Sequence, residues 1–231
     1  MYQFKSRVRY SETGVDARLS LMGIMNYMQD CSTFQSEDCG VGLAYLEEKN
    51  RAWLLSSWQI QILRRPALGE EITVCTWPYE IKGIYGLRNF TLMDGTGEYL
   101  VKANSCWFLL DTEAGKPVRV TREDVDAYGD EEPKLSMDYA PRKIRLPEHM
   151  EEAGRLVIMK HQIDTNHHVK WIGRWRPARR KPTAGRSRRS APSIKRRRCW
   201  EIRRSSCGRP ERMDTWYLSA TETEASLPMW N

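Results

Sequence analysis

The sequence has no apolar stretch long enough to cross a bilayer, because a spanning helix needs roughly 18 apolar residues in a row and none occurs here. Its six cysteines include no CxxC pair of the kind used in metal and redox motifs. Residues 1–10 alternate polar and apolar side chains and contain no apolar signal core. These absences argue against membrane insertion and export. They predict a cytoplasmic protein whose cysteines are structural thiols.

Charge is divided unevenly along the chain. Residues 1–169 hold 20 Lys and Arg against 25 Asp and Glu, a net −5, whereas residues 170–231 hold 17 against 5, a net +12. All of the overall excess of +7 therefore comes from the last 62 residues. A basic average normally suggests a nucleic-acid partner. Here the acidic part and the basic part need separate explanations.

Side-chain periodicity predicts a strand, one long helix and then a run of strands. Residues 2–10 alternate as a strand, and residues 20–35 place apolar side chains at helical spacing. Asp94-Gly95 is a hairpin signal. Four later stretches alternate as strands, namely 57–62, 71–79, 85–93 and 99–110. One apolar helix followed by antiparallel strands predicts the α+β class, with a curved sheet wrapped around the helix.

The order of elements suggests that this unit is repeated. Residues 121–153 are acidic and contain prolines, as expected of a linker with short helical pieces. Residues 154–162 alternate as a further strand, and the polar stretch 163–169 follows it. Strand, polar connection and helix is also the order in which the chain begins. The pattern therefore indicates a second copy of the unit starting near residue 140.

Several stretches, taken in order, resemble the acyl-acyl carrier protein thioesterases of plants and bacteria. They are Trp58–Ile62 with Arg65-Pro66 and Gly69-Glu70, then Thr76-Trp77, Arg88–Asp94, Ser105–Asp111 with Gly115–Arg119, and finally Asp164–Val169. The resemblance covers residues 2–169. It implies a double hotdog fold, in which each antiparallel sheet wraps a central helix. The first hotdog is expected at 1–135. The start of a second, incomplete hotdog is expected at 136–169.

The resemblance places the family's catalytic residues on Asp164, Asn166 and His168. Thioester hydrolysis needs an activated water and a stabilised oxyanion. His168 suits the general base, because an imidazole titrates near neutral pH, at about 6.5. Asn166 can donate an amide N–H to the oxyanion, and Asp164 can orient either partner. The competing interpretation is that Asp164 and Asn166 form a helix-capping pattern.

The same resemblance implies hydrolysis of fatty acyl chains carried on acyl carrier protein, as part of fatty acid biosynthesis, with no cofactor. His161, His167 and His168 are close in sequence, but no cysteine or further acid has ligand spacing with them, so no metal is expected. A hotdog acyl-coenzyme A thioesterase would differ only in the carrier, and a homodimer is left open. Four tryptophans suit either the sheet core or an acyl-chain pocket: Trp53, Trp58, Trp77 and Trp107.

Residues 170–231 depart from the family pattern. The family continues with an amphipathic helix, whereas this chain has Pro177 and Pro182, which would break one. One interpretation is a nucleic-acid-binding tail on a non-enzymatic hotdog domain, since arginines alternate here with tryptophans that could stack on bases. The other interpretation is that the correct gene is read in the wrong frame from about residue 170.

The genetic code favours the second interpretation. In a frame that starts one base earlier, Trp200-Glu201 and Met213-Asp214 each force Gly, and Trp216-Tyr217 and Met229-Trp230 each force Val. In that frame, residues 193–202 permit a sequence that resembles the strand after the central helix of the thioesterase family. Residues 212–231 permit a hairpin with Asp-Gly turns between alternating strands. Nucleic acid is then not an expected partner. The printed segment should be largely disordered, because high charge with few apolar residues does not offset the entropy of ordering.

Overall fold

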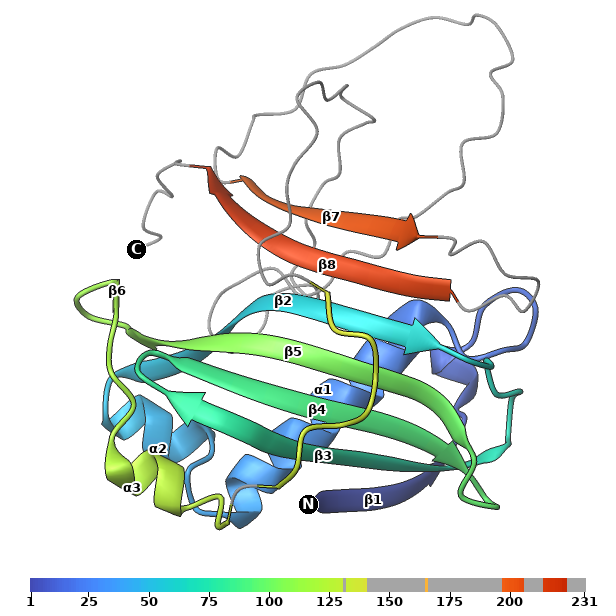
Figure 1. The fold of residues 1–231 in the computed structure, drawn as a ribbon, viewed down its shortest axis with the longest axis horizontal. Helices are drawn as coiled ribbons and strands as arrows, with labels where there is room; N and C mark the ends of the chain where they lie inside the picture. The colour runs from blue at the N-terminus through green and yellow to red at the C-terminus, as the bar shows by residue number, and fades with distance from the viewer. Residues whose placement is uncertain (131, 141–164, 166–196, 206–213, 224–231) are drawn as a thin grey trace, which may run out of the picture. The chain divides into compact units, whose positions relative to one another are not determined.

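The computed structural model describes residues 1–130, 132–140, 165, 197–205 and 214–223 (Figure 1). Its helical elements are η1 Tyr10–Glu12, α1 Leu21–Asp38, α2 Leu43–Glu48 and α3 Arg122–Asp126. Its strands are β1 Tyr2–Arg7, β2 Arg51–Ile62, β3 Glu71–Lys82, β4 Tyr85–Asp94, β5 Tyr99–Asp111, β6 Lys116–Pro117, β7 Arg197–Ser205 and β8 Asp214–Thr223. One long helix and a majority of strands confirm the α+β class.

The strands through residue 117 form one antiparallel sheet in the order β1-β3-β4-β5-β2, with β6 paired to β5. The turn at Asp94 joins β4 to β5, as the Asp-Gly signal predicts. The side chain of Asp94 accepts hydrogen bonds from the backbone N–H groups of Thr96 and Glu98, at 2.9 and 3.0 Å. An aspartate that bonds its own turn in this way favours a tight connection.

Helix α1 begins where its sequence supplies a cap. The hydroxyl of Ser20 accepts a hydrogen bond from the backbone N–H of Gly23, at 2.9 Å. Gly23 also allows close approach, because a Cβ there would lie 2.5 Å from the carbonyl oxygen of Glu12. The apolar spacing predicts residues 20–35, and the helix runs three residues further, to Asp38.

The sheet wraps α1 with one face. The ring of Phe4 on β1 contacts those of Tyr27 and Phe34 on α1, with centroids 6.4 and 5.7 Å apart. Phe4 lies opposite Val74 in the register, and Val74 lies opposite Leu92, so these side chains share that face. We call it the inner face and the opposite one the outer face. Its buried apolar side chains include Ile60, Ile62, Ile72, Val74, Phe90, Leu92, Val101 and Ala103.

The outer face is crossed by residues 132–140, which we call the strap. In Figure 1 the strap runs in front of the sheet, and α1 lies behind it. The sheet is therefore covered on both faces, by a helix on one side and by an irregular segment on the other. This arrangement confirms the predicted hotdog, a curved antiparallel sheet wrapped around one apolar helix.

Several boundaries differ from those expected. β1 ends at Arg7, because the chain enters η1 instead of continuing as a strand to residue 10. β2 starts at Arg51, six residues before the predicted strand. The added residues Trp53 to Leu55 do not alternate polar and apolar side chains, but they pair with β5. Helix α2 had no sequence signal strong enough to predict it. The short helical piece expected in the linker is α3, and Thr121 caps it.

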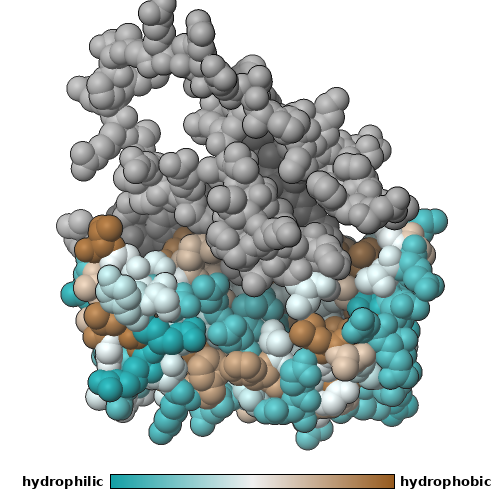
Figure 2. Space-filling view, turned by 180° about the vertical axis from the view of Figure 1, so that it is seen from behind, coloured by the Kyte–Doolittle hydropathy of each residue, from teal (hydrophilic) through white to brown (hydrophobic). Residues whose placement is uncertain are grey.

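On the face of the molecule seen in Figure 2, exposed hydrophobic residues lie in separate areas. Figure 2, seen from behind Figure 1, shows a largely hydrophilic surface interrupted by separate hydrophobic areas over the described part of the chain. Among the described residues, no helix is both long enough and apolar enough to span a membrane.

Two strands lie in the basic segment. β8 pairs antiparallel with β2, from Ser57 opposite Ser219 to Ile62 opposite Asp214, and β7 is the other strand. The expectation of a largely disordered 170–231 did not include these strands. The remainder of that segment lies outside the described residues, and the reading frame stays a prediction.

Candidate functional site

The predicted catalytic residues Asp164, Asn166 and His168 lie outside the described residues. Within that motif the structure describes Thr165 alone, which is exposed and in a turn. The proposed second hotdog, from residue 136, is described only through Ala140 and at Thr165. The roles assigned to the three motif residues therefore stay predictions. The described part of the site is what the first hotdog contributes.

A polar row crosses the inner face. Arg88 on β4 lies opposite Ser105 on β5, and Ser105 lies opposite Trp58 on β2. All three side chains are buried. The hydroxyl of Ser105 accepts a hydrogen bond from the indole N–H of Trp107, at 2.7 Å. This row places polar groups within a sheet face that is largely apolar.

Arg88 carries a positive charge in this interior. Its guanidinium donates to the side-chain oxygens of Gln35 on α1 and Thr76 on β3, and it lies 5.2 Å from the ring centroid of Tyr128. None of the ion pairs among the described residues includes Arg88. Loss of hydration lowers the pKa of Arg88, while the Tyr128 hydroxyl acts in the opposite direction. A buried cation without an ion-pair partner needs hydrogen bonds to neutral acceptor oxygens to offset its loss of hydration.

The tryptophans divide between the two faces. Trp58 is buried against Phe90 on the inner face, with ring centroids 4.7 Å apart. Its indole N–H has no hydrogen-bond acceptor among the described residues. Trp53 packs over Gly86, where a Cβ would approach its ring to 3.3 Å. Trp77 instead lies on the outer face and donates to the strap, so it belongs to neither the inner core nor a pocket beside α1.

A buried thiol on α1 and a half-buried phenol on β3 are held in their neutral forms. Burial raises the pKa of the Cys31 thiol to about 12, and it donates to the carbonyl oxygen of Val74 at 3.5 Å. Burial also raises the pKa of Tyr79, whose hydroxyl donates to Oδ1 of Asn104 at 3.0 Å. Neither group is therefore suited to act as a nucleophile or base near neutral pH.

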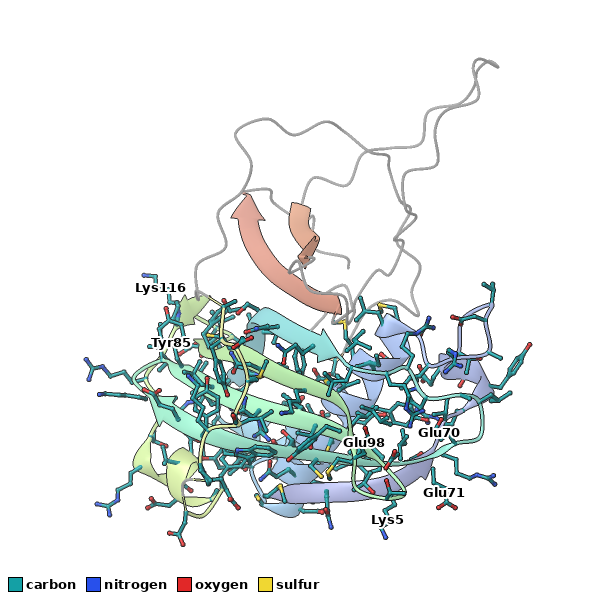
Figure 3. All side chains as sticks on the ribbon, turned by 45° about the vertical axis from the view of Figure 1, so that its right-hand side comes forward. Lys5, Glu70, Glu71, Tyr85, Glu98 and Lys116 are labelled. Carbon is teal, nitrogen blue, oxygen red and sulfur yellow. The ribbon has the colours of Figure 1, made fainter. Side chains whose placement is uncertain are left out.

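The charged ends of the sheet are separate from this interior. Figure 3 shows Glu70, Glu71 and Glu98 at one end of the sheet and Tyr85 and Lys116 at the other. No group of three or more acidic, histidine or cysteine side chains within the described part of the chain is arranged to hold a metal ion.

The strap-binding side chains were missed by sequence reasoning. Asn89, Gln59 and Trp77 are buried on the outer face and bond the strap backbone. The available signal was the pair Arg88-Asn89, a charged residue beside an amide in the middle of strand β4. A polar residue at such a position needs a partner when it is buried.

Known proteins resemble the chain both in sequence and in fold. The acyl-ACP thioesterase N-terminal domain family matches residues 1–128. The acyl-(acyl carrier protein) hydrolase FATB2 of Cuphea viscosissima, a chloroplastic protein, is 27% identical over 184 residues, which are 72% of this chain and 44% of that protein. A chloroplastic palmitoyl-acyl carrier protein thioesterase of Gossypium hirsutum is 26% identical over 183 residues, which are also 72% of this chain and 44% of that protein.

Two solved structures share the arrangement. An acyl-ACP thioesterase from Bacteroides thetaiotaomicron superposes with a TM-score of 0.64 at 25% identity, covering 73% of this chain and 68% of that one. The 12:0-ACP thioesterase from Umbellularia californica superposes with a TM-score of 0.60 at 20% identity, covering 73% and 70%. The chain spans less than half the length of the two plant relatives named above. Because the family match covers more than half of the 231 residues and lies on the helix-wrapped sheet, the chain belongs to the acyl-ACP thioesterase family.

Proposed function

We propose that the chain is a thioester hydrolase that releases fatty acids from acyl carrier protein. The observation that carries this proposal is the family match over residues 1–128, which coincides with a hotdog whose helix and sheet are both described. The motif at 164–168 supports it, since it supplies residue types that can activate water and stabilise an oxyanion.

In the proposed reaction, His168 removes a proton from a water molecule that attacks the thioester carbonyl carbon. Asn166 donates a hydrogen bond to the carbonyl oxygen as negative charge develops on it. Asp164 orients His168 or Asn166. The carbon–sulfur bond then breaks, and His168 returns its proton to the leaving sulfur, so that the carrier's thiol and the free fatty acid are released. No step requires a metal or cofactor.

A reducing compartment, the cytoplasm, fits this proposal. Cys31 and Cys75 are buried thiols and Cys39 is a half-buried thiol, and none of them is joined in a disulfide. The plant relatives are chloroplastic proteins, so the location of this chain is a separate question from its reaction.

The test is hydrolysis of acyl-acyl carrier protein, measured as release of free thiol. Acyl-coenzyme A with the same acyl chain is the comparison, since it differs only in the carrier. Faster turnover of the carrier-protein substrate supports the proposal. Equal or faster turnover of acyl-coenzyme A would assign the chain to the other carrier. The assay should include both the printed chain and a frame-corrected chain, in which the segment from residue 170 is read in the shifted frame.

A further inference from the structure

The two edges of the hotdog sheet differ in how their sequences protect them. The order β1-β3-β4-β5-β2 makes β1 and β2 the edges of that sheet. An edge strand leaves a row of backbone N–H and C=O groups that can pair with another chain, and short length, charge, proline or a bulge usually protects it. β1 has six residues and carries Lys5 and Arg7, both exposed. β2 has twelve, and residues 52–63 contain neither a charged residue nor a proline.

A bulge divides β2 into two parts. The register with β5 shifts between Leu55 and Ser57. Because a bulge twists the strand locally and interrupts regular pairing, it makes residues 51–55 a poor template for another strand. Residues 57–62 pair with β5 without interruption, and we call them the open edge. High strand propensity without charge or proline is the composition of segments that pair with copies of themselves.

β8 covers the open edge and its pairing stops at the bulge. The register runs from Ser57 opposite Ser219 to Ile62 opposite Asp214, so every residue of the open edge has a partner in β8. No described strand pairs with residues 51–55 on that side of β2. The part of β2 that its sequence leaves open is therefore the part that β8 occupies.

The open edge is also complementary to itself. An antiparallel pair of two β2 strands about a two-fold axis at Ile60 places Trp58 opposite Ile62 of the second copy. It places Gln59 opposite Gln61 in the same way. Apolar side chains then lie against apolar ones and amides against amides, with no like charges opposed. A second copy of this chain is therefore the partner that fits this edge when β8 does not occupy it.

We propose that the open edge is a self-association surface and that β8 is its cover. While β8 is paired, a second copy cannot reach the backbone groups of residues 57–62. When β8 leaves, two copies pair through β2. The proposal does not depend on thioester hydrolysis, and it gives residues 214–219 a role as printed. The rival account is that the strap, bonded to Gln59 through Asp138 and Ala140, keeps a second copy away without β8.

The first experiment displaces the cover in the full chain with Leu218→Pro. Leu218 lies opposite Trp58, and proline has no N–H to pair within a strand. Glu222→Pro is the matched control, because Glu222 lies in β8 beyond the residues paired with β2. Sedimentation velocity over a range of protein concentrations measures self-association. We expect Leu218→Pro to dimerise at a concentration about tenfold lower than the unmodified chain, the scale of one or two lost backbone hydrogen bonds.

Glu222→Pro should dimerise at the same concentration as the unmodified chain. Unchanged dimerisation of Leu218→Pro would overturn the role of β8 and favour the strap as the cover. Equal association of the two proline variants would also contradict the proposal, because any disturbance of β8 would then have the same effect as loss of its pairing with β2.

A charge on the edge tests where the two copies meet. Ser57→Lys, added to Leu218→Pro, places a lysine at a half-buried position of the open edge and should return dimerisation to the unmodified level. Gln3→Lys in the same background adds the same charge to β1, the other edge, where Gln3 is exposed, and should leave dimerisation unchanged. Equal reversal by both lysines would assign the effect to net charge and overturn the β2 contact.

Amide hydrogen exchange of Leu218→Pro at low and high protein concentration locates the contact without a further substitution. If two copies pair through β2, residues 57–62 exchange faster in the dilute sample and regain protection in the concentrated one. Association without this protection of residues 57–62 would place the contact elsewhere and overturn the proposal. Thermal denaturation of each variant establishes that the hotdog is folded before association is compared.

Discussion

Arg88 on β4 donates a hydrogen bond from Nη1 to Oε1 of Gln35 on α1, which joins the sheet to its central helix through a buried charge. The same nitrogen donates to Oγ1 of Thr76 at 3.3 Å. A hotdog needs only apolar contact between helix and sheet to bury its core. This hydrogen bond also fixes the orientation of α1 on the sheet, because it forms only at one rotation and one axial position of the helix.

Removing Gln35 should therefore leave a buried cation short of an acceptor. We expect Gln35→Leu to lower the free energy of unfolding by about 2–3 kcal/mol, the usual scale for a lost bond to a charged group. Adding Arg88→Met should recover part of that loss, because it removes the uncompensated charge. Urea denaturation of the single and double variants measures both effects. Gln29→Leu on α1 is the control, and a double variant no more stable than Gln35→Leu would refute the explanation.

Asp124 joins α3 to β2 and α2. It accepts from the Tyr45 hydroxyl at 2.9 Å, from Nη1 of Arg51 at 3.1 Å and from both N–H and hydroxyl of Thr121. Asp124→Asn should destabilise the protein by about 2 kcal/mol, because it weakens a helix cap and a buried ion pair together. The exposed Asp126→Asn on the same helix should change stability by less than about 0.5 kcal/mol. Thermal denaturation of the two variants tests this difference.

The same carboxylate predicts a pH dependence. Burial alone would raise the pKa of Asp124, but hydrogen bonds from Thr121 and Tyr45 outweigh it, so the folded-state pKa is lowered. A lowered pKa means that its stabilisation is present above the unfolded-state value, near 4, and is lost as pH falls through the folded-state value. The stability difference between the unmodified chain and Asp124→Asn should therefore shrink below about pH 4. A difference that stays constant down to pH 2 would contradict this assignment.

The motif residues should govern turnover in a frame-corrected protein. His168→Ala and Asn166→Ala should each lower hydrolysis of acyl-acyl carrier protein by about 10²-fold or more, the scale for losing a general base or an oxyanion donor. His167→Ala is the matched control, because it removes a neighbouring imidazole, and it should retain turnover within about threefold. Near-normal turnover in His168→Ala or Asn166→Ala would remove that residue from the mechanism.

The printed chain should be a less effective hydrolase than the frame-corrected one. Active sites need supporting structure that holds reacting groups to within about 0.5 Å. The helix that should follow the motif is replaced here by residues 170–231, which contain Pro177, Pro182 and 17 Lys and Arg. Turnover and protease cleavage after Val169 should be compared in the two chains. Equal turnover and equal resistance to cleavage would mean that the segment belongs to the fold as printed.

Local periodicity was enough to predict most of the first hotdog. Helix α1 and strands β3, β4 and β5 follow from apolar spacing, because a helix repeats every 3.6 residues and a strand every two. The Asp94-Gly95 turn follows from local backbone chemistry. These features depend on residues near one another in the chain, so sequence alone determined them, together with the family resemblance carried by the ordered motifs.

Tertiary structure decided what each polar position does. The alternation of Gln59 and Gln61 with Ile60 and Ile62 would equally suit a strand with a solvent-facing side. Gln59 gains its buried hydrogen-bond partners only because the strap returns over the outer face, roughly 80 residues later in the chain, with Asp138 and Ala140 beside it. Arg88 likewise hydrogen-bonds α1 only because the fold brings β4 next to Gln35. Such pairings join residues distant in sequence, and hydrogen bonding between them depends on a geometry that no local pattern contains.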